Sequence, residues 1–146
     1  FSPERMMLSD ISEVVMLEQS VSPTPWSGTI FTDCLKAGYE CWVLRSSEVF
    51  GYLILASAAR ESHLLNIAIH PNSQGRGFGR SFLEFAISLA TNEGSERLFL
   101  EVRPSNSSAR ALYQKRGFQF LGRRPNYYGR PAKEDALVLS LEFIPD

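Results

Sequence analysis

A glycine-rich segment in the middle of the chain places the strongest constraint on the fold. Gln74–Arg80 contains three glycines at alternate positions, and it follows the apolar run His63–Ile69. A helical stripe of apolar residues begins at Phe78, and a strand-like alternation follows at Arg97–Val102. A strand, a helix and a second strand in this order indicate one parallel crossover over residues 63–102.

Patterns outside this crossover predict a mostly antiparallel sheet, and therefore an α+β fold. The connections between the early strands are too short for crossovers, which favours antiparallel neighbours. Helices are indicated where a capping residue precedes an apolar stripe. The predicted strands are 2–7, 41–45, 49–58, 118–121 and 136–143, and the predicted helices begin at an Asp10–Glu13 capping box, at Ser27 and at Asn106.

Size and composition are those of one ordinary globular domain over residues 1–146. Of the 146 residues, 44% are hydrophobic and 21% are charged, so the chain can bury a core and is too apolar to be disordered. Its most apolar stretch, Val49–Ala59, is far shorter than the roughly 20 residues of a membrane span, and no signal peptide is expected. Two cysteines, Cys34 and Cys41, are too few for a disulfide framework, so we expect both to be buried and the protein to be cytoplasmic.

The charge distribution excludes some ligands and favours others. A net charge of −1 speaks against general nucleic-acid binding. Acidic side chains outnumber basic ones 8 to 4 in residues 1–73, whereas basic ones lead 11 to 8 in residues 74–146, so an anionic ligand would prefer the second half. The only histidines, His63 and His70, belong to no pattern of metal ligands, so no metal is expected.

The glycine-rich segment suits a phosphate group. Glycines let the backbone approach a ligand closely, and the free N–H groups and the dipole at a helix start favour an anion, to which Arg76 and Arg80 add charge. A nucleotide-binding P-loop does not fit because Gly79-Arg80-Ser81 lacks the lysine. A dinucleotide-binding fingerprint does not fit because the glycine spacing differs.

The spacing Gln74-x-x-Gly77-x-Gly79 resembles the Q/R-x-x-G-x-G/A motif of the GCN5-related N-acetyltransferase (GNAT) superfamily, and the order of predicted elements resembles it over nearly the whole chain. The resemblance implies a mixed sheet with helices on both faces and acetyl-CoA, as co-substrate, in the cleft between the fourth and fifth strands. In this family the loop binds the pyrophosphate, and the preceding strand runs beside the pantetheine. The residues thereby implied to bind the cofactor are Gly75, Arg76, Gly77, Phe78, Gly79 and Arg80 in the loop, and Ile67, Ala68 and Ile69 in the strand.

The segment Leu100–Phe118 resembles that of the RimI-type ribosomal-protein alanine N-acetyltransferases. The resemblance implies that Glu101 accepts the amine proton, and that Tyr113 donates a proton to the leaving thiolate and contacts coenzyme A, as does Asn106. The pKa of an α-amine, about 7.7–8.0, leaves roughly a tenth of it neutral at about pH 7, against under about 0.1% of a lysine. A carboxylate acting through water is therefore an adequate base for an α-amine.

Two further loops, Pro25–Ser27 and Arg123–Tyr128, resemble RimI-type segments that narrow the acceptor groove. The resemblance implies that Trp26, Tyr127 and Tyr128 bind the acceptor, an N-terminal alanine of a small-subunit ribosomal protein. A monomer that binds neither nucleic acid nor membrane is expected. The residues leave open the same chemistry on other protein N-termini, on lysines or on a small amine, and also a non-catalytic acyl-CoA-binding module of the same fold.

Overall fold

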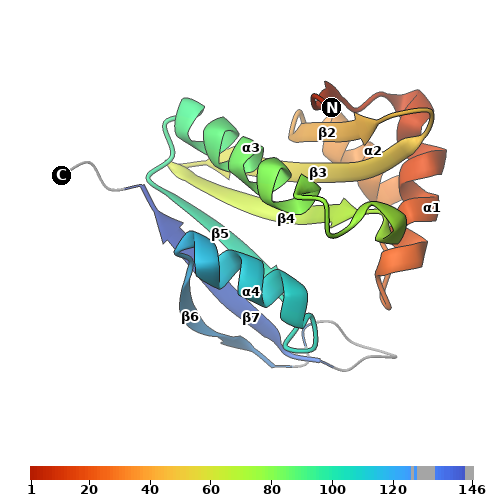
Figure 1. Cartoon of the computed structure of the whole chain (residues 1–146). Helices are drawn as coiled ribbons and strands as arrows, with labels where there is room; N and C mark the ends of the chain where they lie inside the picture. Colours follow the sequence, from red (N-terminus) through yellow and green to blue (C-terminus); the bar gives the residue numbers. More distant parts are fainter. Residues whose placement is uncertain (126, 128–133, 144–146) are drawn as a thin grey trace.

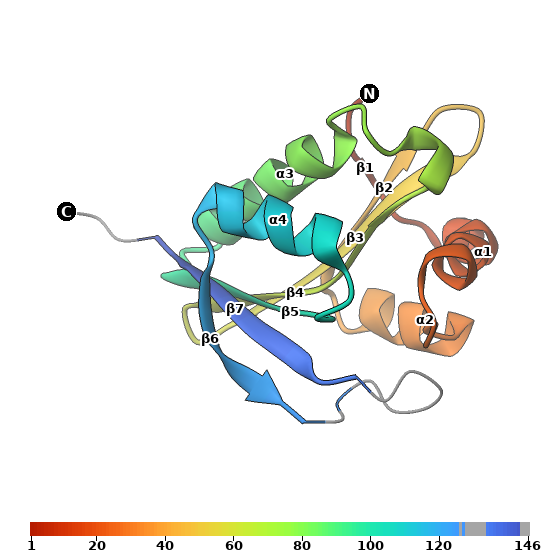
Figure 2. The ribbon, with the colours of Figure 1, turned by 60° about the horizontal axis from the view of Figure 1, so that its bottom comes forward.

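One seven-stranded sheet runs through the described part of the chain, which covers residues 1–125, 127 and 134–143 of the computed structural model. The strands, in their order across the sheet, are β1 (Glu4–Arg5), β2 (Glu40–Arg45), β3 (Val49–Ala58), β4 (Glu61–Ile69), β5 (Arg97–Val102), β7 (Ala136–Glu142) and β6 (Gln119–Arg124). The helices are α1 (Ile11–Val21), α2 (Gly28–Lys36), α3 (Phe78–Asn92) and α4 (Ser107–Arg116). α1 and α2 cover one face of the sheet, and α3 and α4 cover the other (Figures 1 and 2). None of these described helices is long and apolar enough to cross a membrane.

β4 and β5 form a parallel pair, as the crossover predicted, and the other described strand pairs are antiparallel. The pairing of β4 with β5 ends at Leu64 and Leu100. Beyond that point β4 stays paired to β3 as far as Ile69, and β5 stays paired to β7 as far as Val102. The two strands therefore part within the sheet, and Figure 1 shows them diverging. We call this place the β4–β5 opening.

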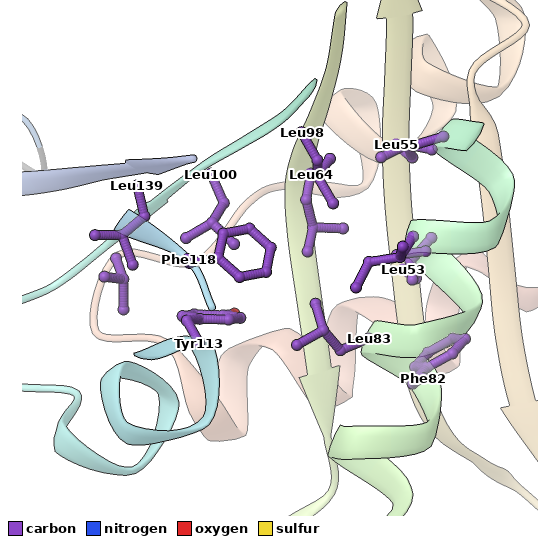
Figure 3. Close-up of a cluster of buried hydrophobic side chains, with 14 of the residues drawn as sticks. Leu53, Leu55, Leu64, Phe82, Leu83, Leu98, Leu100, Tyr113, Phe118 and Leu139 are labelled. Atoms are coloured by element: carbon purple, nitrogen blue, oxygen red, sulfur yellow. The ribbon is translucent and has the colours of Figure 1, made fainter. Parts of the chain in front are cut away.

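The two faces of the sheet carry separate cores. Leucine and phenylalanine side chains fill the face under α3 and α4, among them Leu53, Leu83 and Leu100 (Figure 3). The face under α1 and α2 holds a second cluster that includes Phe31 and Tyr52, together with both cysteines, which are buried as predicted. Successive residues of a strand point to opposite faces, and β2, β3 and β4 accordingly contribute to both cores, whereas β5 and β7 contribute to the α3/α4 core.

The capping box predicted at Asp10–Glu13 is wrong. A 3₁₀ turn, η1 (Leu8–Asp10), precedes α1, so Asp10 already has helical backbone angles, φ −87° and ψ −14°, and its side chain makes no cap. Asp10 Oδ2 instead accepts the Met7 N–H at 2.8 Å. Glu13 bonds to the first backbone amide of β3 at 2.9 Å. Asp10 therefore caps the 3₁₀ turn η1 ahead of α1, and Glu13 ties α1 to β3.

The other helix starts agree with prediction. Ser27 Oγ caps α2 and Asn106 Oδ1 caps α4, each by accepting the backbone N–H three residues later at 3.3 Å. The first strand is shorter than the predicted 2–7, and β6 extends beyond the predicted end at residue 121. β7 lies between β5 and β6, an order that no local pattern indicated.

Candidate active site

The glycine-rich loop leaves β4 and enters α3 through left-handed backbone. Gly75 and Gly77 have φ of +78° and +83°, a conformation that side chains rarely adopt. A Cβ at either position would meet nothing within 4 Å, so the space in front of both is open. Gln74 Nε2 donates to the Ile69 carbonyl at 3.0 Å and ties the loop to the end of β4. Gly79 lies deeper, where a Cβ would be 3.9 Å from a side chain of α4.

Backbone amides gather at the start of α3. Helix geometry leaves the N–H groups of its first turn, Phe78–Arg80, without acceptors inside the helix. Among the residues that the structure describes, no backbone carbonyl accepts from the amides of Gly75, Arg76 or Gly77. Arg76 and Arg80 are exposed. Amide donors, a positive helix end and two guanidinium groups together fit the pyrophosphate of coenzyme A.

Phe78 differs from its loop neighbours because its side chain is used in packing. The Phe78 ring centroid lies 4.9 Å from that of Phe50 and 5.8 Å from that of Phe1. Its backbone N–H is therefore the group it offers to a ligand in the loop. A pocket of about 260 Å³ on this packed side, lined also by Phe82 and Phe85, contains neither predicted catalytic residue and is separate from the β4–β5 opening.

The end of β4 borders the β4–β5 opening. Ile67 packs against the α3/α4 core, Ala68 packs against the α1/α2 core, and Ile69 is buried. Past Leu64, the backbone on this edge of β4 has no ladder partner on β5 among the described residues. A pantetheine arm carries amide groups, and an exposed strand edge binds such groups as it binds an added strand. The predicted contact of these three residues is therefore a main-chain contact.

The predicted proton acceptor lies on the α1/α2 face of the sheet. Glu101 is the first residue of β5 after the last pair with β4. Its neighbours Leu100 and Val102 point into the α3/α4 core, so the alternation of the strand directs Glu101 the other way. The Glu101 side chain is 15% exposed, and Arg124 Nη2 lies 3.9 Å from its Oε1.

The predicted proton donor comes from the opposite face. Tyr113, on α4, is only 6% exposed and belongs to the α3/α4 core. Its ring centroid lies 5.6 Å from that of Phe118, and Figure 3 shows its oxygen on the side that faces Leu83. The predicted base and the predicted acid thus lie on opposite faces of the sheet, and this arrangement could serve an amine and a thiolate on either side of one carbonyl carbon separately.

Asn106 begins α4, as predicted. Its side-chain carbonyl accepts the Ala109 N–H at 3.3 Å, and the residue is exposed. This cap uses only the carbonyl oxygen, which leaves the amide NH₂ group as the donor with which Asn106 would contact coenzyme A. Capping and cofactor binding are therefore compatible.

The predicted acceptor-binding residues differ in how exposed they are. Trp26 is half-buried, and its ring centroid lies 5.2 Å from that of Phe31 in the α1/α2 core. Tyr127 is 48% exposed, with the Arg124 guanidinium 5.3 Å from its ring centroid. Tyr128 lies outside the described residues. Since Arg124 also approaches Glu101, it connects Tyr127 with the predicted base.

Four polar residues near this site were missed by sequence reasoning: Glu18, Arg103, Arg124 and Glu134. Glu18 is 3% exposed although it is charged, and Arg103 has a side-chain exposure of 11%. Both had a signal in the sequence. Glu18 stands four residues after buried Val14 on a helix, hence on its buried face, and Arg103 shares the parity of Glu101 along one strand.

Both histidines contact neighbouring residues of the fold. The His63 ring stacks on Phe99 with centroids 5.1 Å apart, and His70 Nδ1 accepts the Asn72 N–H at 3.0 Å. In the part of the chain that the structure describes, no three His, Cys, Asp or Glu side chains are grouped as metal ligands would be.

The β4–β5 opening, the glycine-rich loop that follows β4, and the predicted base and acid on opposite faces of the sheet together fit an acetyltransferase site. Residues 8–118 match the acetyltransferase (GNAT) family, and the chain belongs to this family. The family uses acetyl-CoA, and the predicted membership and fold are confirmed.

Within this family, the chain is similar to several individual acetyltransferases. The chain is 36% identical over 134 residues to the ribosomal protein bS18-alanine N-acetyltransferase of Haemophilus influenzae, covering 90% of this chain and 91% of that one. It is similar to the crystal structure of the ribosomal-protein-S18-alanine N-acetyltransferase from Escherichia coli, with a TM-score of 0.89 and 30% identity over 99% and 95% of the two chains. The structure of yncA from Salmonella typhimurium with its cofactor acetyl-CoA shares the fold, with a TM-score of 0.78 and 17% identity over 99% of this chain and 95% of that one.

Proposed function

We propose that this protein transfers the acetyl group of acetyl-CoA to the α-amine of an N-terminal alanine on a small-subunit ribosomal protein, with bS18 as the first candidate. The names of its relatives support this acceptor. One observation supports the chemistry above all others: Glu101 directly follows the last β4–β5 pair and points to the α1/α2 face, whereas Tyr113 lies on the opposite face of the sheet, in the α3/α4 core. We further propose that residues 1–146 act as one domain, as a monomer, in the cytoplasm.

Cofactor binding would rest on two features of the chain. The amides at Gly75–Arg80, with the guanidinium groups of Arg76 and Arg80, would hold the pyrophosphate. The free edge of β4 at Ile67–Ile69 would hold the pantetheine by main-chain hydrogen bonds, and Asn106 would add a donor. When bound, acetyl-CoA supplies a thioester carbonyl that an amine can attack directly.

The chain's own residues would move two protons. Glu101, through a water molecule, would take the proton of the α-ammonium group, so that the neutral amine attacks the thioester carbonyl. Tyr113 would give its hydroxyl proton to the sulfur as the carbon–sulfur bond breaks. The nitrogen loses two protons between ammonium and amide, one before the attack and one from the tetrahedral intermediate, and both would leave on the Glu101 side. The thiolate gains one proton from Tyr113, whose hydroxyl is then restored from solvent. Ammonium and thioester thus give amide, thiol and one proton released to solvent, which balances the reaction. Burial of Tyr113 would keep bulk water from competing as the donor.

Acceptor choice is the link that most needs an experiment. Purified enzyme and acetyl-CoA would be incubated with a peptide bearing an N-terminal alanine, with its Nα-blocked lysine-containing counterpart, and with a polyamine. Thiol release would give the rates, and mass spectrometry would locate the acetyl group. We expect modification of the N-terminal alanine, with a clear preference for the free peptide.

Each other outcome would revise the proposal. A preference for the blocked peptide or the polyamine would replace the acceptor by a lysine or a small amine. Absence of turnover on all three, with coenzyme A still bound, would indicate a non-catalytic acyl-CoA-binding module. Incubation with ribosomal proteins, followed by mass spectrometry, would then test bS18 itself.

A further inference from the structure

The loop between α1 and α2, residues Ser22–Ser27, is held at Thr24 and at Trp26 by two charged side chains that lie outside the loop. We call it the acceptor loop, because it contains Trp26. One anchor comes from α1 and the other from the end of β5. A serine within the loop adds a local bond, since Ser22 Oγ accepts the Thr24 N–H at 3.2 Å.

Glu18 is the first anchor. Its Oε2 accepts the backbone N–H of Trp26 at 3.0 Å, and its Oε1 accepts from the Tyr52 hydroxyl and from Asn66 Nδ2, the latter at 3.2 Å. Burial, and then the charge of Glu18, raise the pKa of Tyr52 above its usual value, so the phenol stays a donor. Asn66 precedes Ile67 on β4. One buried carboxylate therefore joins the acceptor loop to the strand that borders the cofactor.

Arg103 is the second anchor. It follows β5 two residues after Glu101, on the same face of the sheet. Its Nη2 donates to Thr24 Oγ1, and its Nη1 lies 3.7 Å from Glu134 Oε1. Contacts from one planar guanidinium fix the distance between the groups it joins more firmly than a lysine ammonium could.

Glu134 lies just before β7, and its neighbour Asp135 pairs with Arg123 of the second predicted acceptor segment at 3.1 Å. We therefore take Glu134 as part of the opposite wall of the groove. It is itself fixed, because its carboxylate accepts from Ser105 Oγ at 2.8 Å and from the Ser105 N–H at 3.2 Å. Arg103 thus links the acceptor loop with the segment before β7, and it does so next to the predicted base. Arg103 is therefore a side chain on which the separation of the two walls can depend.

We infer that Glu18 and Arg103 are positioning residues that hold the acceptor loop at a fixed distance from the opposite wall, so that the groove fits the flexible end of a polypeptide. This inference rests on the proposed function. A peptide would touch both walls, and its binding would depend on their spacing. A small amine would touch neither wall and would depend only on the cofactor, Glu101 and Tyr113.

The test compares three variants with one control. Arg103→Lys keeps the charge but loses the planar fork, Thr24→Val keeps the shape but loses the acceptor oxygen, and Glu18→Gln replaces one carboxylate oxygen by an NH₂ group. Arg97→Lys is the matched control, because Arg97 begins β5, the strand that Arg103 follows, and likewise joins two side chains, the carboxylates of Glu142 at 3.0 Å and Glu61 at 3.4 Å.

Four readouts separate positioning from general damage. We expect Arg103→Lys and Glu18→Gln to raise KM for an N-terminal-alanine peptide by about 10-fold or more, and Thr24→Val by somewhat less. Acetyl-CoA affinity by calorimetry, and kcat/KM for a small primary amine, should stay within about 2-fold of wild type. Hydrogen exchange at the Trp26 amide should accelerate in Glu18→Gln, and Arg97→Lys should change none of these values.

Equal losses on peptide and small amine, or an unchanged peptide KM, would overturn the inference. Failure of the proposed function looks different: wild type itself would then show no preference for the peptide N-terminus. In that case, slow hydrogen exchange of the Trp26 amide in wild type and faster exchange in Glu18→Gln would still support the anchoring of the loop by Glu18. The same exchange rate in both proteins would refute it.

Discussion

The two faces of the sheet are built by different means. The face under α3 and α4 is a continuous apolar core in which Tyr113 is enclosed by hydrocarbon side chains (Figure 3). The face under α1 and α2 contains Asp10 and Glu18, which are 4% and 3% exposed and are the buried charged residues of the described chain. Each forms hydrogen bonds to a distant part of the fold, Asp10 to Arg45 at 2.7 Å and Glu18 to Asn66 at 3.2 Å.

This difference corresponds to what each face would have to recognise. Packed hydrocarbon fixes the position of whole helices without directional bonds, which is sufficient to hold α3 and its anion-binding loop. Hydrogen-bonded buried charges fix individual loop atoms, and breaking one leaves a costly unpaired group. The α3/α4 face would hold a ligand that is the same in every turnover, whereas the α1/α2 face would choose among acceptors.

The sharpest test of the α3/α4 face is Tyr113→Phe, which keeps the ring and removes the hydroxyl. If this hydroxyl protonates the thiolate, kcat should fall by about 10²-fold or more while acetyl-CoA affinity hardly changes. Steady-state kinetics and calorimetry would measure both. Phe118, the neighbouring ring at 5.6 Å, offers a packing control through Phe118→Leu, which should alter stability more than kcat. Unchanged kcat in Tyr113→Phe would assign this tyrosine to the core alone.

Glu101→Gln tests the α1/α2 face at the reacting centre. At about pH 7 we expect kcat/KM to fall by roughly 10- to 100-fold, because most of the α-amine is protonated and the base is gone. The defect should shrink as pH rises through about 8, since the amine then loses its proton to solvent. A full pH–rate profile of both proteins checks this sign. The matched control is Glu96→Gln, an exposed glutamate paired with Arg60 at 3.1 Å. A defect of constant size at every pH would mean that Glu101 positions the acceptor instead of removing a proton.

Gly77→Asp tests the anion-binding loop that the α3/α4 face supports. The substitution places a carboxylate at the helix start and a Cβ on backbone with φ of +83°, so acetyl-CoA should bind at least about 10-fold more weakly, or about 1.4 kcal/mol. Gly77→Asn carries the same backbone strain without the charge. Gly94→Asp is a second control, because Gly94 follows the other end of α3 with φ of +79° and equally open space. Calorimetric affinities that are equal for Gly77→Asp and Gly94→Asp would refute the loop assignment.

The contrast between the faces also explains what could be predicted from the sequence. The anion-binding loop is local: its glycines, the strand before it and the helix after it are contiguous, so their pattern predicted them together. The anchors of the acceptor loop join residues that are far apart, 79 positions for Arg103 with Thr24 and 48 for Asn66 with Glu18. The periodicity of one helix or strand can show that a residue lies on a buried face. It cannot show which distant residue that side chain will bind.

Two other differences have the same origin. β7 inserts between β5 and β6, and this order depends on which edges remain free after the crossover is formed, not on the strand patterns themselves. Asp10 was read as a helix cap because its local sequence fits one. Its actual partners include Arg45, 35 positions away, and a 3₁₀ turn had already given it helical geometry. The local pattern alone did not show the tertiary partner, Arg45, that Asp10 binds instead of capping α1.

The smallest expected effect concerns the rim of the acceptor side. Tyr127 is 48% exposed, and Arg124 lies over its ring at 5.3 Å. If its hydroxyl binds the backbone of a peptide acceptor, Tyr127→Phe should lower peptide kcat/KM by about 2- to 13-fold, the range that one hydrogen bond of about 0.5–1.5 kcal/mol allows. The ring, and with it the contact to Arg124, is retained, so kcat/KM for a small primary amine and the affinity for acetyl-CoA should not change. Tyr39→Phe is the control, since Tyr39 is exposed to 39% and lies between α2 and β2. An equal loss of kcat/KM for the peptide and for the small amine would mean that Tyr127 acts on the reaction itself, through Arg124 and Glu101. Tyr127 would then not select the acceptor, and on the α1/α2 face the selection of acceptors could not be separated from the reaction.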